Sequence, residues 1–143
     1  MSNIPGQNLN NIQGTYNFAL PIPINSPIPL FDTERDTGKF VKGILLNREK
    51  VLGARIYGAT DYYTPEQIIA DFQVVKPRDG SGGSAIQVPE ELFKKILASV
   101  GLPEPLQEEL LENMLLMPQF GYYGGADLKA SHSVGSSQSP IFP

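Results

Sequence analysis

The sequence predicts an α/β fold with a few short strands and about four helices, two of which form a helical hairpin. Short stretches rich in aromatic and β-branched residues alternate with longer stretches in which apolar residues recur at helical spacing. The 143 residues suffice for one compact domain, and 41% of them are hydrophobic, enough to form a core. Thirteen prolines and fourteen glycines divide the chain into short elements.

The first thirty residues predict a loop followed by two short strands. Residues 15–20 contain two aromatic side chains and alternate loosely between apolar and polar positions, as a strand does. Prolines interrupt residues 21–29, and because proline cannot donate to a sheet ladder, this stretch predicts a loop. Leu30 and Phe31 add a strand residue or two.

A helix is expected to begin at Thr33, because Thr33-x-x-Asp36 resembles a capping box with Asp in place of Glu. Its apolar stripe consists of Phe40, Val41, Ile44 and Leu45. Gly53 marks its end. Residues 54–59, which have Ile and Tyr at their centre, then predict a strand.

The next helix has a strong start signal. Thr64 is a good N-cap, a proline occupies the first helical position, and Gln67 stands at the third. Pro77 ends this helix. The glycine-rich residues 79–84 predict a turn, and residues 85–88 predict another brief strand.

Two amphipathic helices, over about residues 90–100 and 104–117, are expected to pack as an antiparallel hairpin. Gly101 and Pro103 separate them, at the spacing of a helix–helix connection. Their apolar stripes contain Leu92, Phe93, Ile96 and Leu97 in the first helix, and Leu106, Leu110, Leu111 and Met114 in the second. The Ser/Gly/Gln-rich composition after them predicts a disordered tail over residues 131–143.

Composition excludes several classes of function. A net charge of −4 without a basic cluster argues against nucleic acid or an anionic membrane as the partner. The absence of cysteine excludes disulfides, thiolate catalysis and zinc–thiolate sites. No basic, apolar leader begins the chain, and no run reaches the roughly 20 apolar residues of a membrane span. We therefore expect a soluble protein of the cytoplasm or nucleus.

The string from Gly80 to Ala85 matches G-x-G-x-x-A, the fingerprint of a dinucleotide-binding loop. That loop must leave a strand and open a helix, so that helix-end N–H groups face the pyrophosphate. Here the string follows a predicted helix and precedes a predicted strand. The sequence therefore favours a flexible connector over a nucleotide site.

The sequence offers no catalytic residue and no metal site. Short-chain dehydrogenases use a Tyr-x-x-x-Lys pair, and none of the six tyrosines has a lysine four residues later. His132, the only histidine, stands in the predicted tail, where it cannot serve in a triad. The carboxylates are scattered over the first turns of helices, where capping explains them.

Aromatic residues beside glycines form the one candidate ligand cleft. The residues are Tyr62, Tyr63, Phe120, Tyr122 and Tyr123. Glycine lets backbone and rings approach a flat molecule, so such residues can line a cleft for a substrate or partner. The alternative, favoured by the residue types alone, is that they cover the core while their hydroxyl groups reach water.

Four strings in order resemble the C-terminal half of NmrA-like proteins, which are atypical short-chain dehydrogenase relatives. They lie at residues 1–6, 30–41, 58–65 and 108–124, and the resemblance covers about residues 1–130. It implies a partial Rossmann-type fold without the N-terminal dinucleotide-binding half. Residues 1–78 would be a remnant of the sheet region, and residues 84–125 a subdomain for substrate or partner.

The resemblance also implies a cofactor and its contacts. Full-length members bind NADP or NAD, and Met1, Ser2 and Asn3 fall on the stretch that passes the nicotinamide end, provided that a Rossmann half is supplied. The chain alone is expected to bind no cofactor. Asp36 matches a helix-opening Asp with a structural role. Because the family contains both reductases and silent redox sensors, the resemblance leaves enzyme status open.

Two hypotheses of function follow. The chain is either a shortened relative of NAD(P)-dependent oxidoreductases and redox-sensing regulators, or a small module that binds a protein partner or assembles with itself. A homodimer through an open edge of the strand at residues 54–59 is the simplest form of the second hypothesis. Cofactor-free chemistry on an unknown small molecule in the aromatic cleft ranks third.

Overall fold

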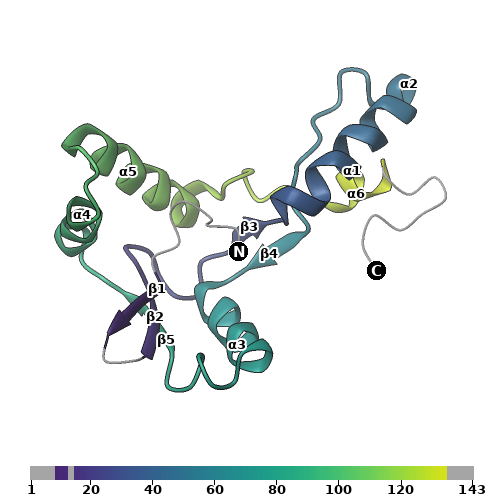
Figure 1. Ribbon diagram of the computed structural model, residues 1–143. Coiled ribbons are helices and arrows are strands. Elements are labelled where there is room, and N and C mark those ends of the chain that lie inside the picture. Colours follow the sequence, from purple (N-terminus) through teal and green to yellow (C-terminus); the bar gives the residue numbers. More distant parts are fainter. Residues whose placement is uncertain (1–8, 13–14, 135–143) are drawn as a thin grey trace. The chain divides into compact units, whose positions relative to one another are not determined.

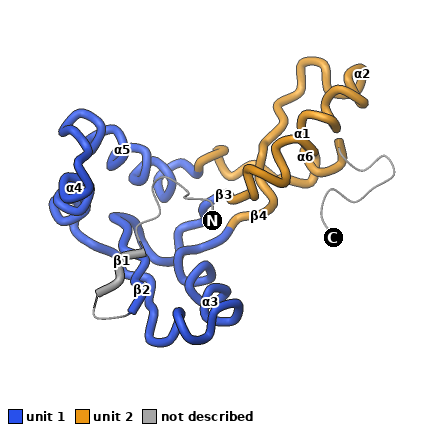
Figure 2. The backbone as a smooth tube through the Cα atoms, in the orientation of Figure 1, with its two compact units in different colours: residues 1–28, 63–121 blue, residues 29–62, 122–143 orange. Residues whose placement is uncertain are grey.

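The structure, a computed structural model, describes residues 9–12 and 15–134 of the chain. These residues form two compact units, coloured separately in Figure 2. Unit 1 contains the segment that ends at Ile28 together with residues 63–121, and unit 2 contains residues 29–62 together with the segment from Tyr122 onward. Each unit thus joins an early and a late part of the chain. The domain boundaries expected from the sequence stay predictions.

The sheet of unit 1 has three strands in the order β1-β2-β5 (Figure 1). β1 (Leu9–Ile12) pairs antiparallel with β2 (Thr15–Leu20), and β2 pairs parallel with β5 (Ser84–Gln87), with Ala19 opposite Ile86. The predicted strand at 15–20 is confirmed, and the one predicted at 85–88 begins one residue earlier. The mixed α/β class is therefore confirmed.

Three helices accompany this sheet: α3 (Pro65–Val75), α4 (Glu90–Ser99) and α5 (Glu104–Phe120). The predicted capping box of α3 is present, because the Thr64 hydroxyl accepts from the Gln67 N–H while the Gln67 side chain accepts from the Thr64 N–H. All three predicted helices of this unit are thus confirmed. α5 continues through Pro118 and ends at Phe120, three residues later than expected.

α4 and α5 form the predicted hairpin, and their buried faces join the sheet and α3 in one core. Lys94 on α4 bonds Glu108 on α5 at 3.0 Å. Leu92 and Leu106, assigned to the apolar stripes, are instead exposed. The buried core contains Phe18, Ala19, Leu20, Ile22, Ile69, Val88, Phe93, Leu97 and Leu111.

Unit 2 contains α1 (Thr33–Leu46), the short α2 (Arg48–Val51) and α6 (Lys129–Ser133). The short strands β3 (Ile28–Leu30) and β4 (Asp61–Tyr63), in which the division between the units falls, pair with each other. β3 thus begins two residues earlier than predicted and includes a proline. The residue that caps α1 is Asp32, not Thr33, because its carboxylate accepts from the backbone N–H groups of the next turn.

The strand predicted at residues 54–59 is wrong. The structure places irregular backbone there, and side chains bind it instead of a neighbouring strand. The Tyr57 N–H donates to the Ser131 hydroxyl at 2.9 Å, and the His132 Nε2 lies 2.8 Å from the Ala59 carbonyl oxygen. The dimer edge expected at this segment is therefore absent.

The disordered tail predicted over residues 131–143 is wrong for its first three residues. Residues 129–133 form α6, and Ser131 is buried with its hydroxyl bonded to Tyr57. A serine-rich composition predicts disorder because serine offers little apolar surface to bury. Here Ser131 contributes a hydrogen bond to unpaired backbone, which composition cannot reveal. Residues 135–143 lie outside the described part of the chain.

The apolar stripe of α1 is only half covered. Phe40 is buried and its ring contacts Phe31 edge-on, with 6.2 Å between the centroids. Val41 and Leu45, one turn apart on the helix, are 50% and 70% exposed. Unit 2 thus carries apolar surface on α1 that its own described residues leave open.

Leu111→Ala tests the assigned core of unit 1. Leu111 is only 3% exposed, and we expect its truncation to lower the free energy of unfolding by about 2–5 kcal/mol, since transfer and cavity terms add. Leu106→Ala on the same helix, where the side chain is exposed, should cost far less. Urea denaturation measures both, and equal losses would contradict the packing.

Candidate functional site

Four tyrosines gather in unit 2. The rings of Tyr57 and Tyr123 lie 4.7 Å apart between centroids, and Tyr122 meets Tyr123 edge-on at 4.9 Å. Tyr62 stands on β4, five residues after Tyr57. The cluster joins residues 57–62 to the aromatic–glycine turn that follows α5 in the sequence.

Two phenol groups of this cluster bond backbone carbonyl groups. The Tyr62 hydroxyl donates to the Ala126 carbonyl at 2.9 Å, and the Tyr123 hydroxyl donates to the Gly58 carbonyl at 3.3 Å. Each bond ties one segment of unit 2 to the other across more than sixty residues of sequence. A phenol that donates to a carbonyl is held in its neutral form. These side chains therefore act as structural ties.

The titration of the two phenols agrees with this role. Burial is the largest cause of the raised pKa of Tyr62, followed by the nearby Tyr57 and Asp127. Burial also raises the pKa of Tyr123, with Tyr122 and Tyr62 adding to it. Proton-transfer catalysis by tyrosine needs a lowered pKa instead. The surroundings of these residues thus oppose formation of the phenolate.

The five residues predicted to line an aromatic cleft fall in both units. Tyr62, Tyr122 and Tyr123 belong to the unit 2 cluster, whereas Tyr63 and Phe120 belong to unit 1. A common ligand cleft for all five stays a prediction. The predicted cofactor contacts Met1, Ser2 and Asn3 lie outside the described residues.

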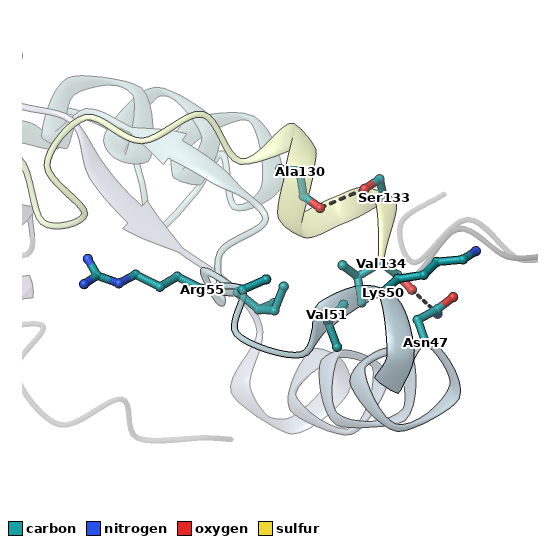
Figure 3. Close-up of a pocket in the computed structure, with 9 residues that line it drawn as sticks. Asn47, Lys50, Val51, Arg55, Ala130, Ser133 and Val134 are labelled. Atoms are coloured by element: carbon teal, nitrogen blue, oxygen red, sulfur yellow. Dashed lines mark hydrogen bonds between the residues drawn. The ribbon is translucent and has the colours of Figure 1, made fainter.

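A cleft of about 440 Å³ opens in unit 2 between the end of α1, the turn after α2 and α6 (Figure 3). Apolar side chains form much of its lining, and Asn47, Lys50, Arg55 and Ser133 are its polar members. The Asn47 amide donates to the Val134 carbonyl, and the Ser133 hydroxyl donates to the Ala130 carbonyl at 2.8 Å. The first bond joins the end of α1 to the residue after α6, whereas the second lies within α6.

The two cations at this cleft do not converge. Figure 3 shows the Arg55 and Lys50 side chains extending in opposite directions. A pyrophosphate or carboxylate needs several donors aimed at one point. The cleft therefore lacks the arrangement of an anion site. No sequence motif marks this cleft, because its residues come from separate segments of the chain.

The Gly80–Ala85 string connects α3 to β5, as predicted from its context. Two of its glycines are needed for packing. A Cβ at Gly83 would lie 2.7 Å from the Tyr16 carbonyl oxygen, and one at Gly80 would lie 2.8 Å from the Gln73 Cα. These glycines allow the turn to pass close to β2 and α3.

Other kinds of site find no support in the part of the chain that the structure describes. No group of three or more His, Asp or Glu side chains there could hold a metal ion. No helix among the described residues combines the length and apolar character needed to cross a membrane.

The sequence profile of the NmrA-like family matches residues 2–141. The chain belongs to the NmrA-like family. Among curated proteins, no sequence matches it. The predicted family is therefore confirmed.

Two solved structures share the fold. One is NmrA, a negative transcriptional regulator, in complex with NADP, with 19% identity and a TM-score of 0.66 over 94% of this chain and 43% of that one. The other is NmrA in complex with NAD, with 19% identity and a TM-score of 0.64 over 90% and 41% of the two chains. The chain thus spans less than half the length of the solved proteins that it matches. That it corresponds to their C-terminal half stays a prediction.

The tyrosine ties generate a prediction about pH. Because folding raises the pKa of Tyr62 and Tyr123 above the ordinary value of 10.0, their stabilising effect is complete below pH 10 and is lost as pH rises through the folded-state values. The Tyr62→Phe, Tyr123→Phe double variant should lose stability more gradually above pH 10 than the parent. Urea melts between pH 8 and 11.5 measure this, with Tyr16→Phe in unit 1 as the control. Parallel pH profiles for parent and double variant would contradict the assignment.

Proposed function

We propose that this chain is a protein-binding portion of an NAD(P)-linked regulator, and that by itself it neither holds a dinucleotide nor transfers hydride. Membership of the NmrA-like family supports the link to regulation and to NAD(P), since NmrA is a negative transcriptional regulator solved with both cofactors. Three features of the described residues support the absence of dinucleotide binding, the absence of catalysis and the binding of protein.

The geometry of the glycine-rich turn carries the proposal. The Gly80 N–H donates to the Lys76 carbonyl at 2.7 Å, and the Gly83 N–H donates to the Gly80 carbonyl at 3.0 Å. A dinucleotide loop must instead present its N–H groups to the pyrophosphate at the start of a helix. The one string that matches the fingerprint thus uses these donors within the protein.

The tyrosines support a non-catalytic role. In a short-chain dehydrogenase, a neighbouring lysine lowers the pKa of the tyrosine that moves the proton. Here burial raises the pKa of Tyr62 and Tyr123, and both hydroxyls donate to backbone carbonyls. These phenols are therefore poor candidates for proton transfer.

Exposed apolar side chains support binding to protein. Besides Val41 and Leu45 on α1, the large exposed residues of unit 2 include Leu46 and Leu52. Apolar surface that gathers on one element is typical of an interaction site. In unit 1, the outer strand β5 offers a second surface, since its side chains are exposed or half-buried.

Titration with cofactor tests the first part of the proposal. We expect isothermal titration of the purified chain with NADPH and with NADH to give no saturable heat up to about 1 mM ligand, a limit that corresponds to about −4 kcal/mol. A functional short-chain dehydrogenase under the same conditions serves as positive control. Micromolar binding of either cofactor would refute the proposal.

Self-assembly is the second candidate function, and exposed Val41 and Leu45 on α1 favour it. A second copy that covers the same face would bury this patch on both chains at once. We expect light scattering after size-exclusion chromatography to give the mass of a dimer, and Leu45→Glu to give a monomer. Lys42→Glu, exposed on the same helix, controls for the added negative charge. A parent that is monomeric at high concentration would exclude this candidate.

A further inference from the structure

The outer edge of β5 carries backbone groups that β2 does not use. β5 is the last strand of the sheet, and its pairing with β2 is parallel. The Val88 N–H donates to the Leu20 carbonyl at 2.9 Å, so the backbone groups of Val88 face β2. Those of Ile86, two residues earlier, face β2 as well. Because successive residues of a strand direct their N–H and C=O to opposite sides, those of Ala85 and Gln87 face away from β2.

Two adjoining hollows follow this edge. One of about 620 Å³ is lined by residues 23–25, Glu66 and residues 85–87. The other, of about 330 Å³, lies between α3 and β5 and shares Ile24, Glu66 and Ala85 with the first. We name them together the β5 groove. The backbone groups of Ala85 and Gln87 therefore border the β5 groove.

The β5 groove is preformed by bonds to its walls. The Glu66 N–H donates to the Ile24 carbonyl at 3.2 Å, which joins α3 to the proline-rich loop. At the other end, the Gln73 side-chain amide donates to the Gly83 carbonyl at 2.9 Å and so occupies the edge there. The open part of the edge thus begins after Gly83. It is long enough for a strand of about four or five residues, at about 3.3 Å per residue.

Charge indicates what the groove accepts. Glu66 is the only charged residue among the described residues that line the two hollows, so the groove favours a basic side chain. Ile24 and Ile86, 38% and 41% exposed, offer apolar contacts beside it. A strand that is added to a sheet edge gains affinity from backbone bonds and specificity from alternate side chains.

The groove does not suit a second copy of this chain. The described strands Leu9–Ile12, Ile28–Leu30, Asp61–Tyr63 and Ser84–Gln87 contain no Lys or Arg to meet Glu66. The edge of β5 is also bordered by α3 and the loop at 23–25, and a copy of β5 paired there would bring its own α3 and its own loop to the same edge.

We propose that the β5 groove binds an extended segment of another protein as an added strand, with a Lys or Arg of that segment paired to Glu66. This rests on the proposed function as a protein-binding portion and names the surface and the kind of partner. The alternating groups of Ala85 and Gln87 provide two donors and two acceptors for that strand.

A displayed library of random heptapeptides, panned against the full chain, tests the proposal. We expect enriched peptides to be rich in β-branched residues, to contain Lys or Arg, and to avoid proline. Gln87→Pro removes one outward N–H and leaves the pairing with β2 intact, because that N–H does not face β2. It should weaken the best peptide about tenfold or more by fluorescence polarisation, which corresponds to about 1.4 kcal/mol. Gln87→Ala should bind like the parent.

A charge exchange provides a second arm that does not depend on the proline variant. Glu66→Lys should weaken a lysine-containing peptide about fivefold, and a peptide with Glu in place of that lysine should recover the loss. Glu91→Lys is the matched control, since Glu91 is also an exposed acid in the first turn of a helix of unit 1.

Several results would overturn the proposal. They are enriched peptides that bind the parent and Gln87→Pro equally, peptides without a basic preference, a library that yields no binder, or a dimer of the chain that Gln87→Pro dissociates. The outcome is separate from the cofactor titration. Binding of NADPH would refute the non-dinucleotide function and leave the groove result as it stands, whereas failure of the peptide arms would leave the titration result untouched.

Discussion

Buried backbone N–H and C=O groups need hydrogen-bond partners, and this requirement governs how unit 2 is built. Residues 54–60 form neither helix nor strand: the Thr60 N–H donates to the Leu30 carbonyl of β3, but the Tyr57 N–H and the Gly58 and Ala59 carbonyl groups need other partners. Their partners come instead from the far end of the described chain: the Ser131 hydroxyl accepts from Tyr57, Tyr123 donates to Gly58, and His132 meets Ala59. The hydroxyl groups of Ser131 and Tyr123 and the ring of His132 thus bond to backbone groups of this segment. The late segment is part of the unit for that reason.

In unit 1, the backbone groups on one edge of β5 find hydrogen-bond partners in β2. The groups on its other edge have no partner strand among the described strands. β2 lies between β1 and β5 and is covered on both edges, whereas β5 has a partner on one edge only among the described strands. Exposed strand edges invite pairing with another chain. The loop at 23–25 and α3 line the hollows beside this edge, where we propose that a single extended segment binds.

The elements that the sequence predicted correctly are those whose decisive signals are local. The capping box at Thr64 and the α4–α5 hairpin depend on residues close in sequence, and the residue pattern of 15–20 marks a strand although β2 pairs with the distant β5. The strand predicted at residues 54–59 is wrong, because an Ile–Tyr pair is as compatible with irregular backbone as with a strand. The side chains that bind this backbone in place of a neighbouring strand stand more than sixty residues away. The capping of α1 by Asp32 instead of Thr33 is a smaller error of one residue between two good cap formers.

The candidate site shows why residue type alone does not decide between a cleft and a structural tie. Aromatic residues beside glycines suit both, and what distinguishes them is where each hydroxyl points. Tyr62 and Tyr123 direct theirs to carbonyl groups of their own unit, which uses the O–H donor that a polar ligand would otherwise engage. The Gly80–Ala85 string follows the same logic, since the N–H groups of Gly80 and Gly83 donate to the carbonyl groups of Lys76 and Gly80, and the absence of side chains at these two glycines leaves room for Tyr16 and Gln73. In both places the groups that looked available for a ligand are used by the fold. The strongest remaining capacity for a partner in unit 1 therefore lies in the backbone of β5, which no sequence motif marks.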